Sequence, residues 1–103
     1  MDIITKHLRK VVDKVWNKWG LARTENEELF NASLGLAGEA GEVCDLIKKM
    51  HFHDYKKGRR AELLLELGDC YFYLSKIQDL FGFTTEEVLE ANKQKLFERH
   101  DIQ

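Results

Sequence analysis

Apolar side chains recur at every third or fourth position through most of this 103-residue chain, and no proline interrupts the pattern. Residues at that spacing share one face of an α-helix. Because proline is the strongest helix breaker, its absence permits long uninterrupted helices. The pattern predicts an all-α fold in a single domain over residues 1–103, a length that supports one modest core.

Four main helices are expected, over residues 3–19, 25–50, 60–81 and 84–98. The second and fourth begin at capping boxes, Thr24 with Glu27 and Thr84 with Glu87, in which each side chain satisfies a backbone N–H at the helix start. Gly20 is a plausible stop for the first helix, and Gly82 is expected to end the third. Residues 51–60 carry no apolar period and are dense in His, Lys and Arg, so we expect a loop there.

Glycines interrupt the apolar pattern of the second helix at positions 35, 38 and 41. Each glycine costs a helix about 1 kcal/mol relative to alanine. One interpretation is that the helix bends, or that a neighbour packs closely against it. The other is that small residues leave room for metal and phosphate beside Glu39 and Glu42. The two interpretations are compatible, and the sequence leaves both open.

Composition favours a soluble globular protein, with 44% hydrophobic and 33% charged residues. The net charge of −2 gives no general attraction to nucleic acid or to an anionic membrane. The first residues lack the pattern of a secretory leader, and no apolar run is long enough to cross a bilayer. Cys44 and Cys70 are typical of free thiols in a reducing compartment, so we expect a cytoplasmic protein.

Two pairs of acids, each three residues apart, stand inside these helical patterns: Glu39 with Glu42, and Glu66 with Asp69. Each pair shares one helix face, at the margin of the apolar stripe. If the two helices pack side by side, four carboxylates converge and repel one another, which raises their pKa values. A divalent cation relieves that repulsion, and an all-oxygen site favours Mg²⁺ or Mn²⁺.

Ordinary solvated helix faces are the alternative interpretation of the acids. Against it, Glu39 and Glu42 are flanked by Ala and Gly and lack neighbouring basic side chains. A di-iron bundle would require Glu-x-x-His on two helices, and no histidine stands three residues after any of the four acids. His51 and His53 match no zinc spacing, so a solvated loop is the better interpretation.

The ordered set of motifs resembles a known family. It comprises Glu39-x-x-Glu42, then residues 43–65, then Glu66-x-x-Asp69, and downstream the segment Asn92-x-x-Lys95-x-x-x-Arg99. Together these resemble the MazG-like, all-α nucleoside triphosphate pyrophosphohydrolases over roughly residues 34–99. The resemblance implies hydrolysis of a nucleoside triphosphate between the α and β phosphates, giving a monophosphate and pyrophosphate. It also implies that the four acids hold catalytic Mg²⁺, for which Mn²⁺ could substitute.

The same resemblance implies the substrate contacts and the assembly. Lys95 and Arg99 would bind phosphate oxygens, and Asn92 suits a contact to sugar or phosphate. Lys48 could help, although a basic helix C-terminus that offsets the helix dipole explains it equally well. Outside the resembling segment, Trp16 and Trp19 of the first helix could stack on the nucleobase because aromatic faces accept any base, with core or subunit packing as the alternative. Members of the family are homo-oligomers, so we expect an oligomeric four-helix bundle, as a homodimer or homotetramer.

The sequence leaves several functional questions open. It identifies neither the preferred nucleobase nor the carboxylate that would act as general base. A non-catalytic helical module that binds nucleotide or a protein partner on the same scaffold is the alternative from another functional class.

Overall fold

A computed structural model describes residues 3–18, 24–53 and 58–102 of the chain, with the side chain of residue 5 left out. Within these ranges the secondary structure is four α-helices and no strand, which confirms the all-α class. The helices are α1 (Ile3–Lys18), α2 (Glu25–Phe52), α3 (Arg59–Leu80) and α4 (Thr85–His100). The expected end of the first helix at Trp19 and Gly20 lies outside the described residues.

Both capping boxes form as the sequence predicts. The Thr24 hydroxyl accepts the backbone N–H of Glu27 at 3.1 Å, and the Glu27 carboxylate accepts the backbone N–H of Thr24 at 3.2 Å. The Thr84 and Glu87 pair makes the same two bonds, each of 3.1 Å. The α2 and α4 helices therefore begin where local side-chain chemistry dictates.

The expected loop over residues 51–60 is partly wrong, because α2 continues to Phe52 and α3 begins at Arg59. At its other end α3 stops at a left-handed glycine, Gly82, with φ 73°. The Phe83 N–H donates to the Gln78 carbonyl at 2.9 Å, and the Gly82 N–H donates to the Asp79 carbonyl at 3.1 Å. This pair of bonds is a Schellman motif, which confirms Gly82 as the stop signal.

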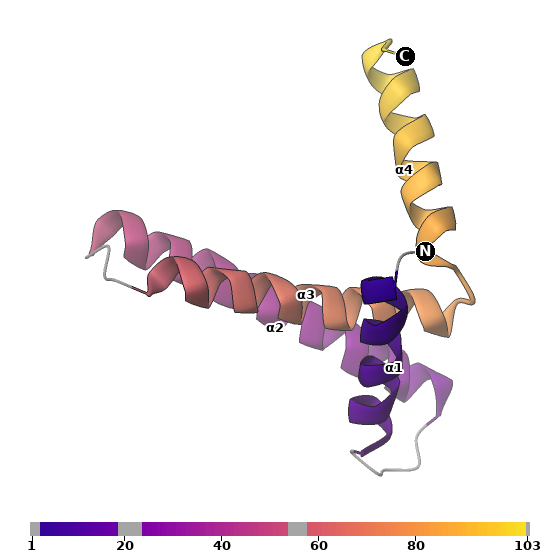
Figure 1. Cartoon of the computed structure of the whole chain (residues 1–103), viewed down its shortest axis with the longest axis horizontal. Helices are drawn as coiled ribbons and strands as arrows, with labels where there is room; N and C mark the ends of the chain where they lie inside the picture. Colours follow the sequence, from indigo (N-terminus) through magenta and orange to yellow (C-terminus); the bar gives the residue numbers. More distant parts are fainter. Residues whose placement is uncertain (1–2, 19–23, 54–57, 103) are drawn as a thin grey trace.

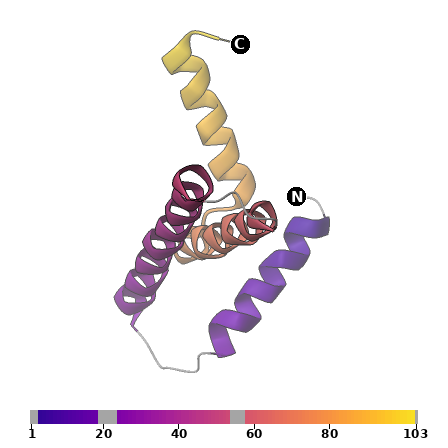
Figure 2. The same cartoon turned by 90° about the vertical axis from the view of Figure 1, so that its left-hand side faces the viewer.

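The helices α2 and α3 lie side by side and antiparallel along most of their length (Figures 1 and 2). The α1 helix crosses the C-terminal half of α3, and α4 leaves the end of α3 and points away from the other helices. The glycines of α2 do not interrupt it, since the helix is continuous from Glu25 to Phe52.

The docking of α1 on α3 uses a face that the apolar periodicity did not predict. Val12 and Trp16 are buried, with 1% and 3% of their surface exposed. Apolar residues at spacings of three and four, which the sequence predicts as the buried stripe of this helix, are instead exposed at Ile4, Leu8, Val11 and Val15. Polar contacts to α3 account for the difference. Arg9 pairs with Asp79, and the Lys76 ammonium lies 3.5 Å from Asp13 and 5.1 Å from the Trp16 ring centroid.

A single chain is open rather than closed around a core. Its radius of gyration is 16.4 Å, whereas a compact domain of this length has about 13 Å. Its accessible surface is 8295 Å², about 2,000 Å² more than size scaling gives for a closed monomer. Large apolar side chains are exposed on every helix, among them Ile4, Phe30, Leu34, Leu64, Leu65, Tyr71 and Leu89. None of the described helices is long and apolar enough to span a membrane.

Candidate metal centre

Three carboxylates meet between α2 and α3. Glu39, Glu66 and Asp69 each place one oxygen within 4.8 Å of the other two. Glu66 and Asp69 lie one turn apart on α3, and the antiparallel packing of α2 brings Glu39 opposite them. Glu39 and Glu66 are half-buried and Asp69 is exposed. The acids thus occupy the margin of the helix pair, where solvent still reaches them.

Glu42, the fourth predicted acid, lies one turn beyond Glu39 on α2 and is exposed. It does not belong to the group within 4.8 Å. Its charge nevertheless acts on Glu39, because it is among the neighbours that raise the pKa of that carboxyl. The structure therefore brings three of the four predicted acids together and leaves the fourth at the edge of the cluster.

The cluster has a strongly negative environment. Burial is the main cause that raises the pKa of Glu39, followed by the charge of Asp69, a hydrogen bond with Glu66 and the charges of Glu66 and Glu42. Burial and then the charges of Glu39 and Asp69 raise the pKa of the Tyr73 hydroxyl. Among the described residues, no lysine or arginine forms an ion pair with the three clustered acids. Asp45 of α2, by contrast, pairs with Lys49 of the same helix at 2.9 Å. Within the described part of the chain, the cluster therefore has no basic side chain paired with it.

A hollow of about 290 Å³ adjoins the acids. Its walls come from three helices: Val15 of α1, Glu39 of α2, and Asp69, Phe72 and Tyr73 of α3. Tyr73 lies one turn beyond Asp69, so the helical period of α3 places it on the same face as the acids. The sequence alone does not indicate a role for it. Phe72 also lies one turn beyond Asp69 on α3, whereas Val15 reaches the hollow only because of how α1 crosses α3, which the sequence does not show.

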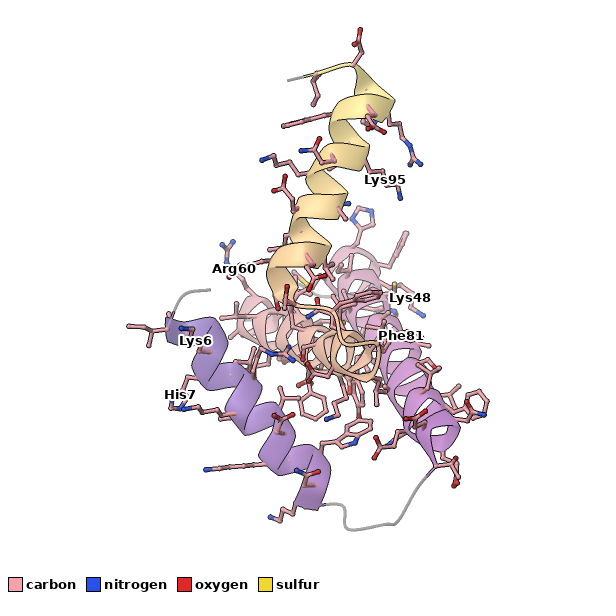
Figure 3. All side chains as sticks on the ribbon, turned by 90° about the vertical axis from the view of Figure 1, so that its right-hand side faces the viewer. Lys6, His7, Lys48, Arg60, Phe81 and Lys95 are labelled. Carbon is pink, nitrogen blue, oxygen red and sulfur yellow. The ribbon has the colours of Figure 1, made fainter. Side chains whose placement is uncertain are left out.

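The predicted phosphate ligands are not part of this cluster within one chain. Asn92, Lys95 and Arg99 are exposed on α4. Figure 3 shows Lys95 on the part of α4 that stands clear of the α2–α3 pair, whereas Lys48 projects from α2. Lys48 is exposed, with its ammonium 4.0 Å from Asp45. Trp16 is buried beneath Lys76, a position that favours packing over stacking on a base.

The donor set fits a hard divalent cation. Two oxygens on opposite sides of Mg²⁺, each about 2.1 Å from the ion, are about 4.2 Å apart. Neighbouring oxygens around such an ion are only about 3.0 Å apart, so the three clustered oxygens, within 4.8 Å of one another, would have to move inward to bind one cation. With no nitrogen or sulfur donor in the group, the chemistry favours magnesium or manganese over zinc.

Facing helices that bring carboxylates together in this way occur in the class of all-α bundles that build metal sites from side chains on facing helices. Comparison with known proteins narrows this class to one family. The family described as the MazG nucleotide pyrophosphohydrolase domain matches residues 27–102, and the chain belongs to this family. It is also similar to the Gene 37 protein of Mycobacterium phage L5, with 34% identity over 80 residues, covering 73% of this chain and 68% of the phage protein. No solved structure matches the chain.

Proposed function

We propose that this chain is a Mg²⁺-dependent nucleoside triphosphate pyrophosphohydrolase. It would hydrolyse the bond between the α and β phosphates and release a nucleoside monophosphate and pyrophosphate. The observation that carries the proposal is the convergence of Glu39, Glu66 and Asp69, with no ion pair to a basic side chain among the described residues, in a chain of the MazG family. A role in removing non-standard or excess nucleoside triphosphates would follow from this activity.

The residues of the chain have distinct tasks in this reaction. Glu39, Glu66 and Asp69 would hold Mg²⁺, or Mn²⁺ in its place, and Glu42 would complete the acidic set from the next turn of α2. The bound cation neutralises polyphosphate charge and orients or ionises the attacking water. Without a cation, the acids would repel a triphosphate. The half-burial of Glu39 and Glu66 strengthens their electrostatic interactions relative to bulk water.

The basic segment of α4 would act from a second copy of the chain. Lys95 and Arg99 would bind phosphate oxygens, and Asn92 the sugar or a phosphate. Two observations support the need for a second copy: α4 points away from the acidic cluster, and each chain exposes about 2,000 Å² more surface than a closed monomer of its size. That excess suits an extensive interface between permanent partners. We therefore propose a homodimer or homotetramer whose sites are shared between chains.

The activity is tested by measuring pyrophosphate release across a panel of canonical and modified NTPs and dNTPs, with and without Mg²⁺. We expect cation-dependent release that Glu39→Gln or Asp69→Asn abolishes while far-UV circular dichroism stays helical. Full turnover in either variant, together with no effect of EDTA, would contradict the proposal. Nucleotide binding without any pyrophosphate release would indicate the binding module instead.

The shared site is tested by mixing two inactive variants, Glu39→Gln and Arg99→Gln, after unfolding and refolding them together. In a dimer with sites formed across chains, half of the mixed population is heterodimer, and each heterodimer has one intact site. Recovery of about a quarter of wild-type activity is therefore expected. Sites formed within one chain would give no recovery. Each variant refolded alone is the control.

A further inference from the structure

The ring of Tyr73 lies directly against the backbone of α2 at Gly35. A Cβ atom added to Gly35 would lie 2.2 Å from Cε1, 2.4 Å from Cδ1 and 2.6 Å from Cζ of that ring. Real Cβ atoms essentially never approach other heavy atoms that closely. A Cβ atom at Gly38 or Gly41, by contrast, would meet nothing within 4 Å. Only Gly35, of these three, must lack a side chain in this packing.

The contact is placed one helical turn from the acids on both helices. Gly35 precedes Glu39 by four residues on α2, and Tyr73 follows Asp69 by four residues on α3. Because α2 and α3 run antiparallel (Figure 1), a residue before Glu39 on α2 and a residue after Asp69 on α3 lie toward the same end of the helix pair. The contact of the Tyr73 ring with Gly35 is therefore only about 6 Å along the helix axis from the carboxylates.

A second aromatic ring also contacts the Tyr73 ring. The Phe72 ring meets it edge-on, with 5.0 Å between ring centroids and 85° between their planes. Tyr73 also forms a wall of the hollow beside Glu39 and Asp69. Because burial and both carboxylates raise the pKa of its hydroxyl, Tyr73 stays neutral at physiological pH and adds no charge to the cluster.

We propose that Gly35 and the Tyr73 ring act as a spacer that sets the separation of α2 and α3 and thereby the geometry of the acidic cation site. Both are positioning residues, and neither needs to touch substrate. The inference rests on the proposed cation site. It also explains why position 35 of α2 is a glycine, which the acids themselves do not.

A methyl group at position 35 would have two ways to fit. The helices could move apart by about 1.2–1.8 Å, from 2.2 Å to an ordinary contact distance of 3.4–4 Å, which would widen the carboxylate cluster. Otherwise the ring could swing into the hollow beside Glu39 and Asp69. Either movement harms Mg²⁺ more than Ca²⁺, because Mg²⁺ demands octahedral geometry at 2.0–2.1 Å while Ca²⁺ accepts irregular ligand sets at 2.3–2.6 Å.

The experiment measures dissociation constants for Mg²⁺ and Ca²⁺ by calorimetric titration of the full chain. Gly35→Ala is expected to weaken Mg²⁺ binding at least tenfold and Ca²⁺ binding less than threefold. Tyr73→Phe keeps the ring and should bind both ions as the wild type does. In the Tyr73→Ala background the clash is gone, so adding Gly35→Ala should change Mg²⁺ affinity less than threefold, a coupling that a double-mutant cycle measures.

The matched control is Gly68→Ala on α3, where an added Cβ meets nothing within 4 Å and no effect on either ion is expected. Far-UV circular dichroism checks that each variant is helical. An unchanged Mg²⁺ affinity in Gly35→Ala would overturn the spacer. An equal loss for both ions, or the same loss with and without Tyr73, would also overturn it.

A spectroscopic readout separates the failure of the spacer from the failure of the proposed function. In the metal-free protein, the Gly35 Hα resonances should be displaced by the ring current of Tyr73, remain displaced in Tyr73→Phe, and return to ordinary values in Tyr73→Ala. If this signature is present but the wild type binds neither cation, the proposed cation site is wrong although the packing is right. If the signature is absent, the spacer itself is wrong.

Discussion

Replacing Glu39 by glutamine should make the metal-free protein more stable than the metal-free wild type. It should make the protein less stable than the wild type when Mg²⁺ is present. Three carboxylates have oxygens within 4.8 Å of one another, and the pKa of Glu39 is raised, so the ionised cluster opposes folding. The amide of glutamine has nearly the same size and can still donate a hydrogen bond to Glu66. The variant therefore removes one charge with little change in packing.

The magnitude follows from the separation of the charges. Two unit charges 4.8 Å apart, the upper limit of the separations in the cluster, repel by about 0.9 kcal/mol at the dielectric constant of water, and the half-burial of two of the acids makes this a lower bound. Glu39 faces two such charges, on Glu66 and Asp69. Salt at about 0.1 M screens part of this repulsion, which leaves a stabilisation of about 1 kcal/mol. For a domain of this size, that corresponds to a rise in melting temperature of roughly 4–8 °C.

The assay is thermal unfolding followed by circular dichroism, at fixed protein concentration, first in EDTA and then with excess MgCl₂. The wild type should gain stability with Mg²⁺ as the cation binds the folded state, whereas Glu39→Gln should gain little. Glu98→Gln, which removes an exposed carboxylate on α4, is the control for net charge and should shift the unfolding free energy by less than about 0.5 kcal/mol. The reasoning is refuted if Glu39→Gln melts no higher than the wild type in EDTA, or if Mg²⁺ stabilises both proteins equally.

Three further outcomes are expected. The pKa of the Glu39 carboxyl is raised in the folded state. Its contribution to stability is therefore full below the pKa in the unfolded state and is lost as pH rises through the pKa in the folded state. In EDTA, the wild type should lose more stability than Glu39→Gln between pH 4 and pH 7. Val12→Ala should lower the unfolding free energy by roughly 1–3 kcal/mol because that side chain is fully buried, while the neighbouring Val11→Ala, 45% exposed, should cost less than half as much in urea unfolding. Thr84→Ala should cost about 1 kcal/mol by removing a capping box, and Thr84→Ser should restore most of it, as judged by thermal unfolding.

The local sequence determined the helices and most of their ends. Capping boxes act between residues three apart, and the stop at Gly82 needs only a residue that accepts positive φ, so both are legible without any tertiary contact. The pairing of Glu66 with Asp69 is equally local, because an i, i+3 spacing places both on one face of any helix. The expectation that acids from two helices would meet was confirmed for three of them.

The tertiary structure decided which helix faces meet. Periodicity marks every apolar face of a helix but does not say which partner covers it. Val12 and Trp16 are buried while Leu8 and Val15 stay exposed, because Arg9 and Asp13 bind α3 and fix the rotation of α1. The close approach of Tyr73 to Gly35 likewise depends on the register of α2 against α3. That register cannot be derived from either helix alone, since it is set by contacts between residues far apart in the chain.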